Sequence, residues 1–250
     1  MRRMAGEIVK TRGIVLAIHP WSRTSHVVTW LTPDHGPVST LVKGAVRPKS
    51  AFLGQYDLFY TCDLLYYANA SGELHAIREV ASLSFREHLR ADWRAVALAG
   101  YAADLIRDLA PPDADSGQWF TALESFLDNL KVSVPTETSA PSSTPKDRSF
   151  TRLIQLDTSI LDLAGLSPDF SGMDASASWT PFAIDRGRCG EGTRTVRLSP
   201  RTAHAIKAPD ATDVALNEKE DAVRFLGVFL AYHIERPADI RRSLVHLLAT

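Results

Sequence analysis

Residues 38–50 read Val-Ser-Thr-Leu-Val-Lys-Gly-Ala-Val-Arg-Pro-Lys-Ser, and this stretch decides the fold of the N-terminal part of the chain. Its first residues alternate in character, with Val38, Thr40 and Val42 on one face, which is the period of a half-buried β-strand. The alternation ends at Gly44, and three of the last eight residues are Lys or Arg. The stretch therefore predicts a strand followed by a basic loop that leads into another strand.

The rest of the first 83 residues repeats this pattern. Runs rich in β-branched, apolar and aromatic residues lie on both sides of the stretch, and turn residues separate them. These runs cover residues 8–18, 27–31, 57–67 and 74–83. With the strand described above they make five strands in about 80 residues, without a helical period between them. An OB-fold barrel has this number of strands, so we predict an OB-fold domain over residues 1–83.

Beyond Ser84 the spacing of apolar residues changes to the period of amphipathic helices. Helices are predicted around residues 89–109, 116–130, 148–164 and 217–233. We therefore predict an all-helical C-terminal domain over residues 84–250. The predicted fold class is α+β, with a five-stranded OB-fold barrel followed by this helical domain.

Two segments interrupt the helical pattern. Residues 133–145 consist mostly of Ser, Thr and Pro, which predicts a mobile loop between helices. Residues 170–209 have no clear period and are expected to be irregular, with a short helix after Ser199-Pro200.

Positive charge is concentrated in the first fifty residues. They hold eight Lys and Arg against two acids, a net charge of +6, whereas the other 200 hold 20 cations and 27 acids, a net charge of −7. The total of −1 hides this asymmetry. A basic segment on an acidic chain indicates a polyanionic partner. Charge alone leaves both nucleic acid and a membrane surface open.

The composition argues against membrane and secreted proteins. No apolar run approaches the ~20 residues of a membrane helix, and the N-terminus lacks the apolar stretch of a signal peptide. Cys62 and Cys189 lie far apart and form no pair-spaced motif, so a disulfide framework is not expected. We expect a cytoplasmic protein with no membrane partner.

A basic loop on an OB-fold is typical of nucleic-acid binding. Lys and Arg neutralise phosphates, and aromatic side chains stack on bases, which contributes roughly 1–3 kcal/mol per base. Most aromatic residues of the predicted barrel occupy strand positions and are expected in its core. Trp21 is the exception, because it lies in a polar stretch beside Arg23. The alternative is that the charges form an ordinary solvated surface.

The sequence carries no recognisable catalytic motif. Its eight histidines show no ligand spacing, and it has no nucleophile elbow, phosphate-binding loop or convincing carboxylate cluster. We expect no enzymatic activity. One rival interpretation is a nuclease or phosphotransferase whose site is assembled across domains. Another is an OB-type module that binds tRNA or oligonucleotides and is unrelated to repair.

Three stretches resemble the RecO family of bacterial recombinational DNA repair mediators, namely residues 11–16, 32–36 and 42–50. Lys10-Thr11-Arg12 is similar to a basic KTR stretch of that family, and residues 43–50 are similar to its signature KGARRPKS. The resemblance implies an OB-fold followed by a helical domain. It also implies binding of single- and double-stranded DNA and annealing of complementary strands. With the partner RecR, such a protein helps load RecA onto DNA covered by single-stranded-DNA-binding protein.

The resemblance places the DNA contacts on the basic N-terminal segment. Arg23 stands where family members usually carry an acid, which makes this surface more basic. Trp21 is the candidate for stacking on a base. The implied phosphate contacts are Lys10, Arg12, Arg23, Lys43, Arg47 and Lys49.

Many members of the family hold zinc with four cysteines in the helical domain. Residues 182–189 are similar to the approach to the second cysteine pair, but Gly192 stands where the partner cysteine belongs. No cysteine lies between Leu163 and Arg188 for the first pair. One thiolate cannot form a structural zinc site. We predict no metal and no cofactor, with this degenerate region, about residues 170–209, held by packing.

The resemblance also implies binding of the C-terminal tail of single-stranded-DNA-binding protein, which ends in acids and apolar residues. Arg241 and Arg242, with Arg236 nearby, form a basic patch beside Ile240 and Leu244. A cationic rim around an apolar groove suits such a peptide. The alternative is a solvated helix end. The implied location is the bacterial nucleoid.

Overall fold

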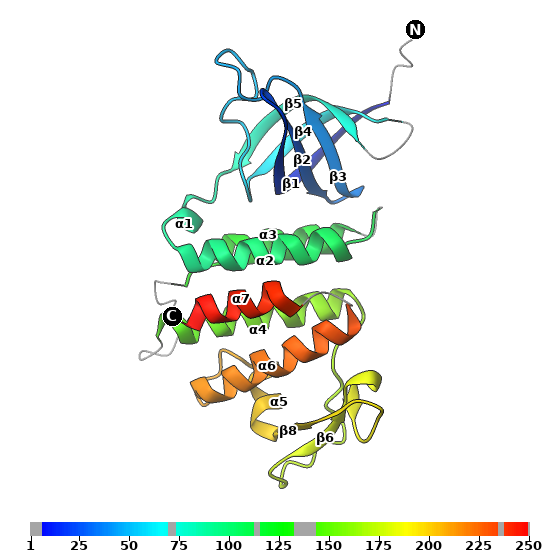
Figure 1. Cartoon of the computed structure of the whole chain (residues 1–250), viewed down its shortest axis with the longest axis vertical. Helices are drawn as coiled ribbons and strands as arrows, with labels where there is room; N and C mark the ends of the chain where they lie inside the picture. Colours follow the sequence, from blue (N-terminus) through cyan, green and yellow to red (C-terminus); the bar gives the residue numbers. More distant parts are fainter. Residues whose placement is uncertain (1–6, 70–73, 113–115, 133–143, 235–237, 250) are drawn as a thin grey trace. The chain divides into compact units, whose positions relative to one another are not determined.

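Figure 1 shows the computed structural model of the chain, which describes residues 7–69, 74–112, 116–132, 144–234 and 238–249. Its contacts divide the chain into two compact units. The barrel unit comprises Met1–Ala91 and Ala102–Asn129, and the helical unit comprises Asp92–Tyr101 and Leu130–Thr250. The helix α2 (Trp93–Leu109) contributes residues to both units.

Five strands close into a barrel, which confirms the predicted OB-like fold (Figure 1). They are β1 (Ile8–Ser22), β2 (Ser25–Thr32), β3 (Gly36–Val42), β4 (Thr61–Tyr67) and β5 (His75–Ser84). Their order is β1-β2-β3-β5-β4, and β4 pairs with β1 to close the barrel. The long strand β1 serves two neighbours, since its first half pairs with β4 and its second half with β2.

The interior of the barrel is filled by the alternating residues of its strands. Val38, Thr40 and Val42 of β3 are buried, as their alternation in the sequence predicts. Trp30 of β2 is fully buried among them, and its Nε1 donates a hydrogen bond to Thr40 Oγ1 at 2.8 Å. The polar atom of this large side chain is therefore satisfied inside an apolar core.

The barrel unit also contains α1 (Glu87–Arg90) and α3 (Gly117–Asn129). Ser116, just before α3, accepts a hydrogen bond from Gly36 N at 2.9 Å and donates to Thr32 O at 2.8 Å. α3 is thereby tied to the turn between β2 and β3.

Arg86 provides a second connection between α3 and the barrel. This buried side chain donates to Asp128 of α3 at 2.6 Å and to the carbonyl oxygen of Phe59 at 2.6 Å. It also donates to Thr61 Oγ1 on β4 at 2.9 Å. A buried charge needs such partners, because desolvation without them would be costly.

The helical unit is built on α4 (Pro145–Leu163), α5 (Pro200–Lys207), α6 (Leu216–His233) and α7 (Ala238–Ala249). The predicted helices correspond to α2, α3, α4 and α6, and the short helix predicted after Ser199-Pro200 is α5. The core of the helical unit includes a cluster of phenylalanines. In this cluster Phe182 packs edge-on against Phe225, with ring centroids 5.1 Å apart.

The region expected to be irregular contains a small antiparallel sheet with the order β7-β6-β8. Its strands are β6 (Thr180–Ala183), β7 (Arg188–Cys189) and β8 (Thr195–Leu198), and the 3₁₀ turn η2 (Ile184–Arg186) follows β6. The helical C-terminal region therefore also carries strands. Segments of two to four residues are too short to show a two-residue period, which is why the sequence pattern did not reveal them.

Most of the predicted Ser/Thr/Pro-rich loop lies outside the described residues, which resume at residue 144. Thr144 is the N-cap of α4, where its side chain accepts a hydrogen bond from Asp147 N at 3.1 Å. Pro145, the last residue of the predicted loop, is the first residue of α4.

Candidate nucleic-acid interface

The basic loop of residues 43–50 is tied to the turn between β1 and β2. Gly44 N donates to Ser25 Oγ at 3.3 Å, and Val46 N donates to Thr24 O at 3.4 Å. These bonds bring together two segments that are about twenty residues apart in the sequence. We call the surface formed by residues 21–25 and 43–50 the barrel end.

Glycine is required at the start of this loop. Gly44 has a φ of 68°, in the left-handed region that side chains rarely adopt. Its carbonyl oxygen accepts a hydrogen bond from Arg47 N at 3.2 Å, and Arg47 O in turn accepts one from Ser50 N at 2.9 Å. Two consecutive tight turns therefore hold the loop.

The four predicted cations of the barrel end are all exposed. They are Arg23 on the β1–β2 turn and Lys43, Arg47 and Lys49 on the loop. Within the described part of the chain, none of them forms an ion pair. Because no carboxylate neutralises them, they create a local positive potential that attracts polyanions.

Trp21 belongs to the same surface, two residues before Arg23, and 63% of it is exposed. Two other aromatic side chains of the barrel are engaged in packing. Trp30 is buried, and Tyr56 accepts or donates a hydrogen bond with His26 at 2.9 Å. Burial raises the pKa of Tyr56 to about 12. Trp21 is therefore the aromatic side chain of the barrel end that can offer a ring face to a base.

Lys10 and Arg12, the other two predicted phosphate contacts, lie on the first half of β1. There they pair with Leu65 and Asp63 of β4. The Arg12 guanidinium lies 5.2 Å from the centre of the Phe120 ring of α3, which is a cation–π contact. Trp21 is nine residues further along β1, up to about 30 Å for an extended strand. The structure thus groups five of the seven predicted residues and places Lys10 and Arg12 apart from them.

Sequence reasoning missed two exposed apolar residues of the segment after β3. Val46 belongs to the loop itself, and Leu53 follows it by a few residues. Both side chains are exposed although they are apolar. Both residues are aliphatic and lie outside any strand period in the sequence, so the pattern gives no reason to expect that they are buried.

The helical unit contains a groove of about 520 Å³ between α4, α6 and α7. Phe150, Val223, Val228 and Val245 contribute apolar surface to it. Five cations and one acid also line it, namely Lys146, Arg194, Arg224, Arg241, Arg242 and Glu220. Two of the predicted partner-binding residues, Arg241 and Arg242, thus line one groove, whereas Arg236 lies outside the described residues.

Arg241 and Arg242 differ in their surroundings. Arg242 is exposed, whereas Arg241 is only 9% exposed and forms an ion pair with the fully buried Asp157. Tyr101 also donates to Asp157, at 3.2 Å. Burial raises the pKa of Asp157, and the charge of Arg241 opposes this shift. The Nε atom of Arg241 has no hydrogen-bond partner among the described residues, so the groove contains an unused buried donor.

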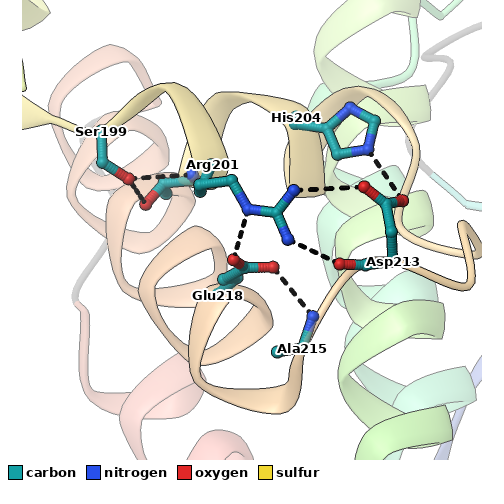
Figure 2. Close-up of polar contacts among 7 residues, drawn as sticks. Ser199, Arg201, His204, Asp213, Ala215 and Glu218 are labelled. Carbon is teal, nitrogen blue, oxygen red and sulfur yellow. Dashed lines mark hydrogen bonds and ion pairs between the residues drawn. The ribbon is translucent and has the colours of Figure 1, made fainter. Parts of the chain in front are cut away.

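Ser199, His204 and Asp213 have the composition of a hydrolase triad, but their geometry is different (Figure 2). The His204 ring donates to Asp213 at 3.2 Å. Ser199 instead accepts a hydrogen bond from Thr202 N at 3.0 Å and caps α5. A nucleophile must be bonded to its base, and Ser199 makes no such bond to His204 in the described structure.

The remaining contacts in Figure 2 explain why these residues are close together. Arg201 of α5 donates to Glu218 of α6 at 2.6 Å and to Asp213 at 3.1 Å. Glu218 also accepts from Ala215 N at 2.8 Å, which satisfies a free N–H at the start of α6. The network therefore joins two helices and their connecting loop, and its role is structural.

The turn around Gly192 does not fit the cysteine that the resemblance places there. The side chain of Asp185 accepts hydrogen bonds from Thr193 N at 3.1 Å and Arg194 N at 3.2 Å, so it holds the turn between β7 and β8. A Cβ at Gly192 would lie 2.3 Å from this carboxylate, which leaves no room there for a cysteine. Among the described residues, no three His, Cys, Asp or Glu side chains are grouped as metal ligands.

None of the helices in the described ranges combines the length and the apolar character needed to cross a bilayer.

Comparison with known proteins identifies the family. The family described as recombination protein O N terminal matches residues 4–86, and recombination protein O C terminal matches residues 90–241. A protein of Anaeromyxobacter sp. (strain K) named DNA repair protein RecO is 26% identical over 255 aligned residues, which cover 94% of this chain and 95% of that protein.

Two further relatives bear the same name. The Myxococcus xanthus (strain DK1622) protein is 26% identical over 239 residues, which cover 89% of this chain and 91% of the relative. The Geobacter metallireducens protein is 29% identical over 144 residues, 58% of this chain and 55% of the relative. The chain therefore belongs to the RecO family of recombination proteins.

Proposed function

We propose that this protein is a recombination mediator that binds single- and double-stranded DNA at the barrel end and anneals complementary strands. With RecR it helps load RecA onto DNA covered by single-stranded-DNA-binding protein, and it acts in the bacterial cytoplasm at the nucleoid. Membership of the RecO family makes it a DNA repair protein and not an enzyme. The observation that carries the DNA-binding proposal is the group of four exposed cations of the barrel end, none of which forms an ion pair among the described residues.

The chemistry of the barrel end suits binding without sequence recognition. Cations that bind phosphates release condensed counterions, which contributes affinity that does not depend on the bases. Annealing requires no catalytic group, because cations can screen two backbones while their bases find partners. Trp21 supplies a ring on which a base stacks, and stacking tolerates any base. Lys10 and Arg12 extend the contact along β1 for DNA that follows the barrel.

The groove of the helical unit is our candidate site for the tail of single-stranded-DNA-binding protein. Its apolar wall accepts apolar side chains, and its cations attract acids. Arg242 contributes a further positive charge at the same groove.

The DNA-binding proposal is tested by replacing Lys43, Arg47 and Lys49 together with Ala and titrating labelled single-stranded DNA at several salt concentrations. We expect weaker binding, and a slope of log affinity against log salt that is smaller in magnitude by about 2, since each phosphate contact contributes about 0.7. An unchanged slope would show that the loop does not contact phosphates.

A matched control removes three cations that already have acidic partners. Arg78, Arg90 and Arg224 each form an ion pair, with Glu79, Asp57 and Asp221 respectively. Their joint replacement by Ala changes the net charge by the same amount as the loop variant. We expect the control to bind DNA with a nearly unchanged salt dependence.

An annealing assay distinguishes a mediator from the rival, which is an oligonucleotide-binding module unrelated to repair. Complementary labelled strands are mixed with the protein, and duplex formation is followed in time. A mediator accelerates this step, whereas a protein that binds DNA and never anneals it favours the rival.

The groove is tested with a labelled peptide that ends in acidic and apolar residues. Val245→Glu places a negative charge in the groove and should weaken peptide binding by at least about tenfold. Ser243→Glu adds the same charge at an exposed position of α7 that does not line the groove, and should leave binding intact. Equal effects of the two variants would contradict the assignment.

A further inference from the structure

The small sheet of the helical unit has a buried inner face, and its outer face carries exposed side chains beside the fully buried Ala183. Phe182 of β6 is fully buried and packs against Phe170 and Phe225. Directly paired residues of neighbouring strands share a face. Val196 and Cys189, which pair with Phe182, therefore belong to the inner face of the sheet.

The same register places two arginines on the outer face. Arg197 of β8 pairs with Pro181, and Arg188 of β7 pairs with Ala183. Pro181 and Ala183 flank Phe182 in β6, so their side chains point away from the phenylalanine cluster. Trp179 lies two residues before Pro181 and has the same orientation by this alternation. Arg188, Arg197 and Trp179 thus come from three separate stretches of sequence to one face.

Trp179 and Arg197 form a stacked pair on this face. The Arg197 guanidinium carbon lies 4.6 Å from the centre of the Trp179 ring, and 45% of the tryptophan surface is exposed. Nucleic-acid bases stack on tryptophan rings and on arginine guanidinium planes alike. A paired ring and guanidinium therefore offer a planar platform that is positively charged and open to solvent.

The stretch of sequence that carries the sheet is basic, although the chain as a whole is acidic. Residues 179–198 hold four arginines and two acids, a net charge of +2. The four arginines are exposed, and none forms an ion pair among the residues that the structure describes; they are Arg186, Arg188, Arg194 and Arg197.

The nearby acids have other partners or lie at the edge. Asp185 is occupied by two backbone N–H groups. Asp169 accepts hydrogen bonds from Ser171, and its interaction with Arg188 is a weaker electrostatic one. Glu191, in the turn after β7, is exposed. None of these acids forms an ion pair with Arg188 or Arg197 among the described residues, so both guanidinium groups remain available to a polyanion.

We propose that the outer face of the β7-β6-β8 sheet is a second binding site for single-stranded DNA, separate from the barrel end. A base stacks on the Trp179–Arg197 platform, and Arg188 and Arg186 contact the neighbouring phosphates. The site deepens the proposed function and rests on it, because two separate DNA sites allow one protein to hold two strands during annealing.

The chemistry favours a single strand over a duplex. A base must turn its flat face to the platform, and in a duplex that face is covered by the neighbouring base pairs. Loss of the ring should therefore weaken binding of single strands more than binding of duplexes. Loss of the arginines should weaken both, because phosphates are present in both.

The test uses the full chain and four variants, each in a parent background and in the Lys43/Arg47/Lys49→Ala background. The variants are Trp179→Ala, Trp179→Phe, Arg186→Ala with Arg188→Ala, and the control Arg201→Ala. The control removes one charge from α5 of the same unit, where Arg201 is paired with Glu218 and Asp213. Labelled single-stranded and duplex DNA are titrated at several salt concentrations, and thermal unfolding verifies that every variant is folded.

In the loop-variant background we expect Trp179→Ala to weaken single-strand binding by about five- to 100-fold at an unchanged salt slope. Trp179→Phe should restore much of the loss, since phenylalanine retains a ring. The double arginine variant should reduce the magnitude of the salt slope by about 1.4. In the parent background the barrel end still binds DNA, and there the sheet variants should anneal complementary strands more slowly than the unmodified protein.

Three results would overturn the proposal. The first is unchanged affinity and slope in both sheet variants, although the unmodified protein binds DNA. The second is an equal effect of Trp179→Ala on single strands and duplexes. The third is loss of acidic-peptide binding in the sheet variants while DNA binding is retained, which would make this face a peptide site. If the unmodified protein does not bind DNA at all, the proposed function itself fails.

Discussion

The barrel end and the interior of the helical unit both contain lysine and arginine side chains, but in opposite environments. At the barrel end, Arg23 and Arg47 are exposed and form no ion pair among the described residues. In the helical unit, Arg241 is buried against Asp157, and Lys219 is buried against Asp147 at 2.9 Å. Burial and pairing, rather than the number of cations, decide which of them are available to a polyanion.

The difference also separates stability from binding. A buried ion pair that loses one member leaves an uncompensated charge, which costs about 3–5 kcal/mol. An exposed cation without a partner contributes little to stability and can be replaced at low cost. Substitutions of the two groups should therefore have distinct effects, and the following predictions are arranged from the largest expected effect to the smallest.

The largest effect is expected from Arg241→Ala, which leaves Asp157 buried without its counterion. The free energy of unfolding should fall by about 3–5 kcal/mol, as measured by urea denaturation. The neighbouring Arg242→Ala is the control, because Arg242 is exposed. Replacing the pair together, with Arg241→Met and Asp157→Leu, should recover most of the loss. A loss below 1 kcal/mol for Arg241→Ala would show that this buried ion pair does not contribute to stability as the comparison requires.

Arg86→Ala tests whether the barrel unit depends on a buried cation in the same way. The change removes hydrogen bonds to Asp128, Phe59 O and Thr61, and leaves a buried carbonyl without this donor. We expect the free energy of unfolding to fall by about 2–3 kcal/mol. Arg90→Ala is the control, since Arg90 pairs with Asp57 in solvent. Equal effects of the two variants would show that burial does not decide the outcome.

Trp21→Ala tests whether an exposed residue of the barrel end contributes to DNA binding and not to stability. We expect the affinity for single-stranded DNA to fall by about 1–3 kcal/mol, because a stacking platform is lost. The free energy of unfolding should change by less than about 0.5 kcal/mol, because Trp21 is exposed. The buried Trp30 is the matched contrast, and Trp30→Ala should instead destabilise the barrel by several kcal/mol. DNA affinity that is insensitive to Trp21 would remove this residue from the interface.

The smallest effect concerns the exposed network around Asp213. Its hydrogen bonds from His204 and then from Arg201 hold the pKa of this carboxyl below its ordinary value. A lowered pKa means that the stabilisation is present above the ordinary value of about 4 and is lost as the pH falls through the folded-state pKa. The stability difference between the unmodified protein and Asp213→Asn should therefore be present at pH 7 and disappear in strong acid. A difference that persists at the lowest pH would contradict this.

Local patterns in the sequence were sufficient for most of the fold. The alternation of Val38, Thr40 and Val42 predicted β3, and the change of period after Ser84 located the start of the helices. Helix boundaries were less well predicted. The helix predicted around residues 217–233 begins one residue earlier, at Leu216, and Glu218 accepts the hydrogen bond from Ala215 N. Several side chains can satisfy the same free N–H groups, so spacing alone does not select one.

The candidate site could be predicted only in part. Exposure of Trp21 follows from its polar neighbours in the sequence, and its cations are visible there as charge. The contact of Arg12 with Phe120 of α3 was not predictable, because it joins residues that are distant in the sequence. The outer face of the small sheet was missed altogether, since its strands are too short to show a period.

The sequence by itself determined the strands, the main helices, the excess of charge in the first fifty residues and the resemblance to a family, because each of these resides in neighbouring residues. Only the tertiary structure decided which charges are free. It placed residues 43–50 beside the β1–β2 turn, buried Arg241 against Asp157, and brought Trp179 beneath Arg197. These pairings join residues that are distant in sequence, and the energy of a charge depends on what surrounds it after folding.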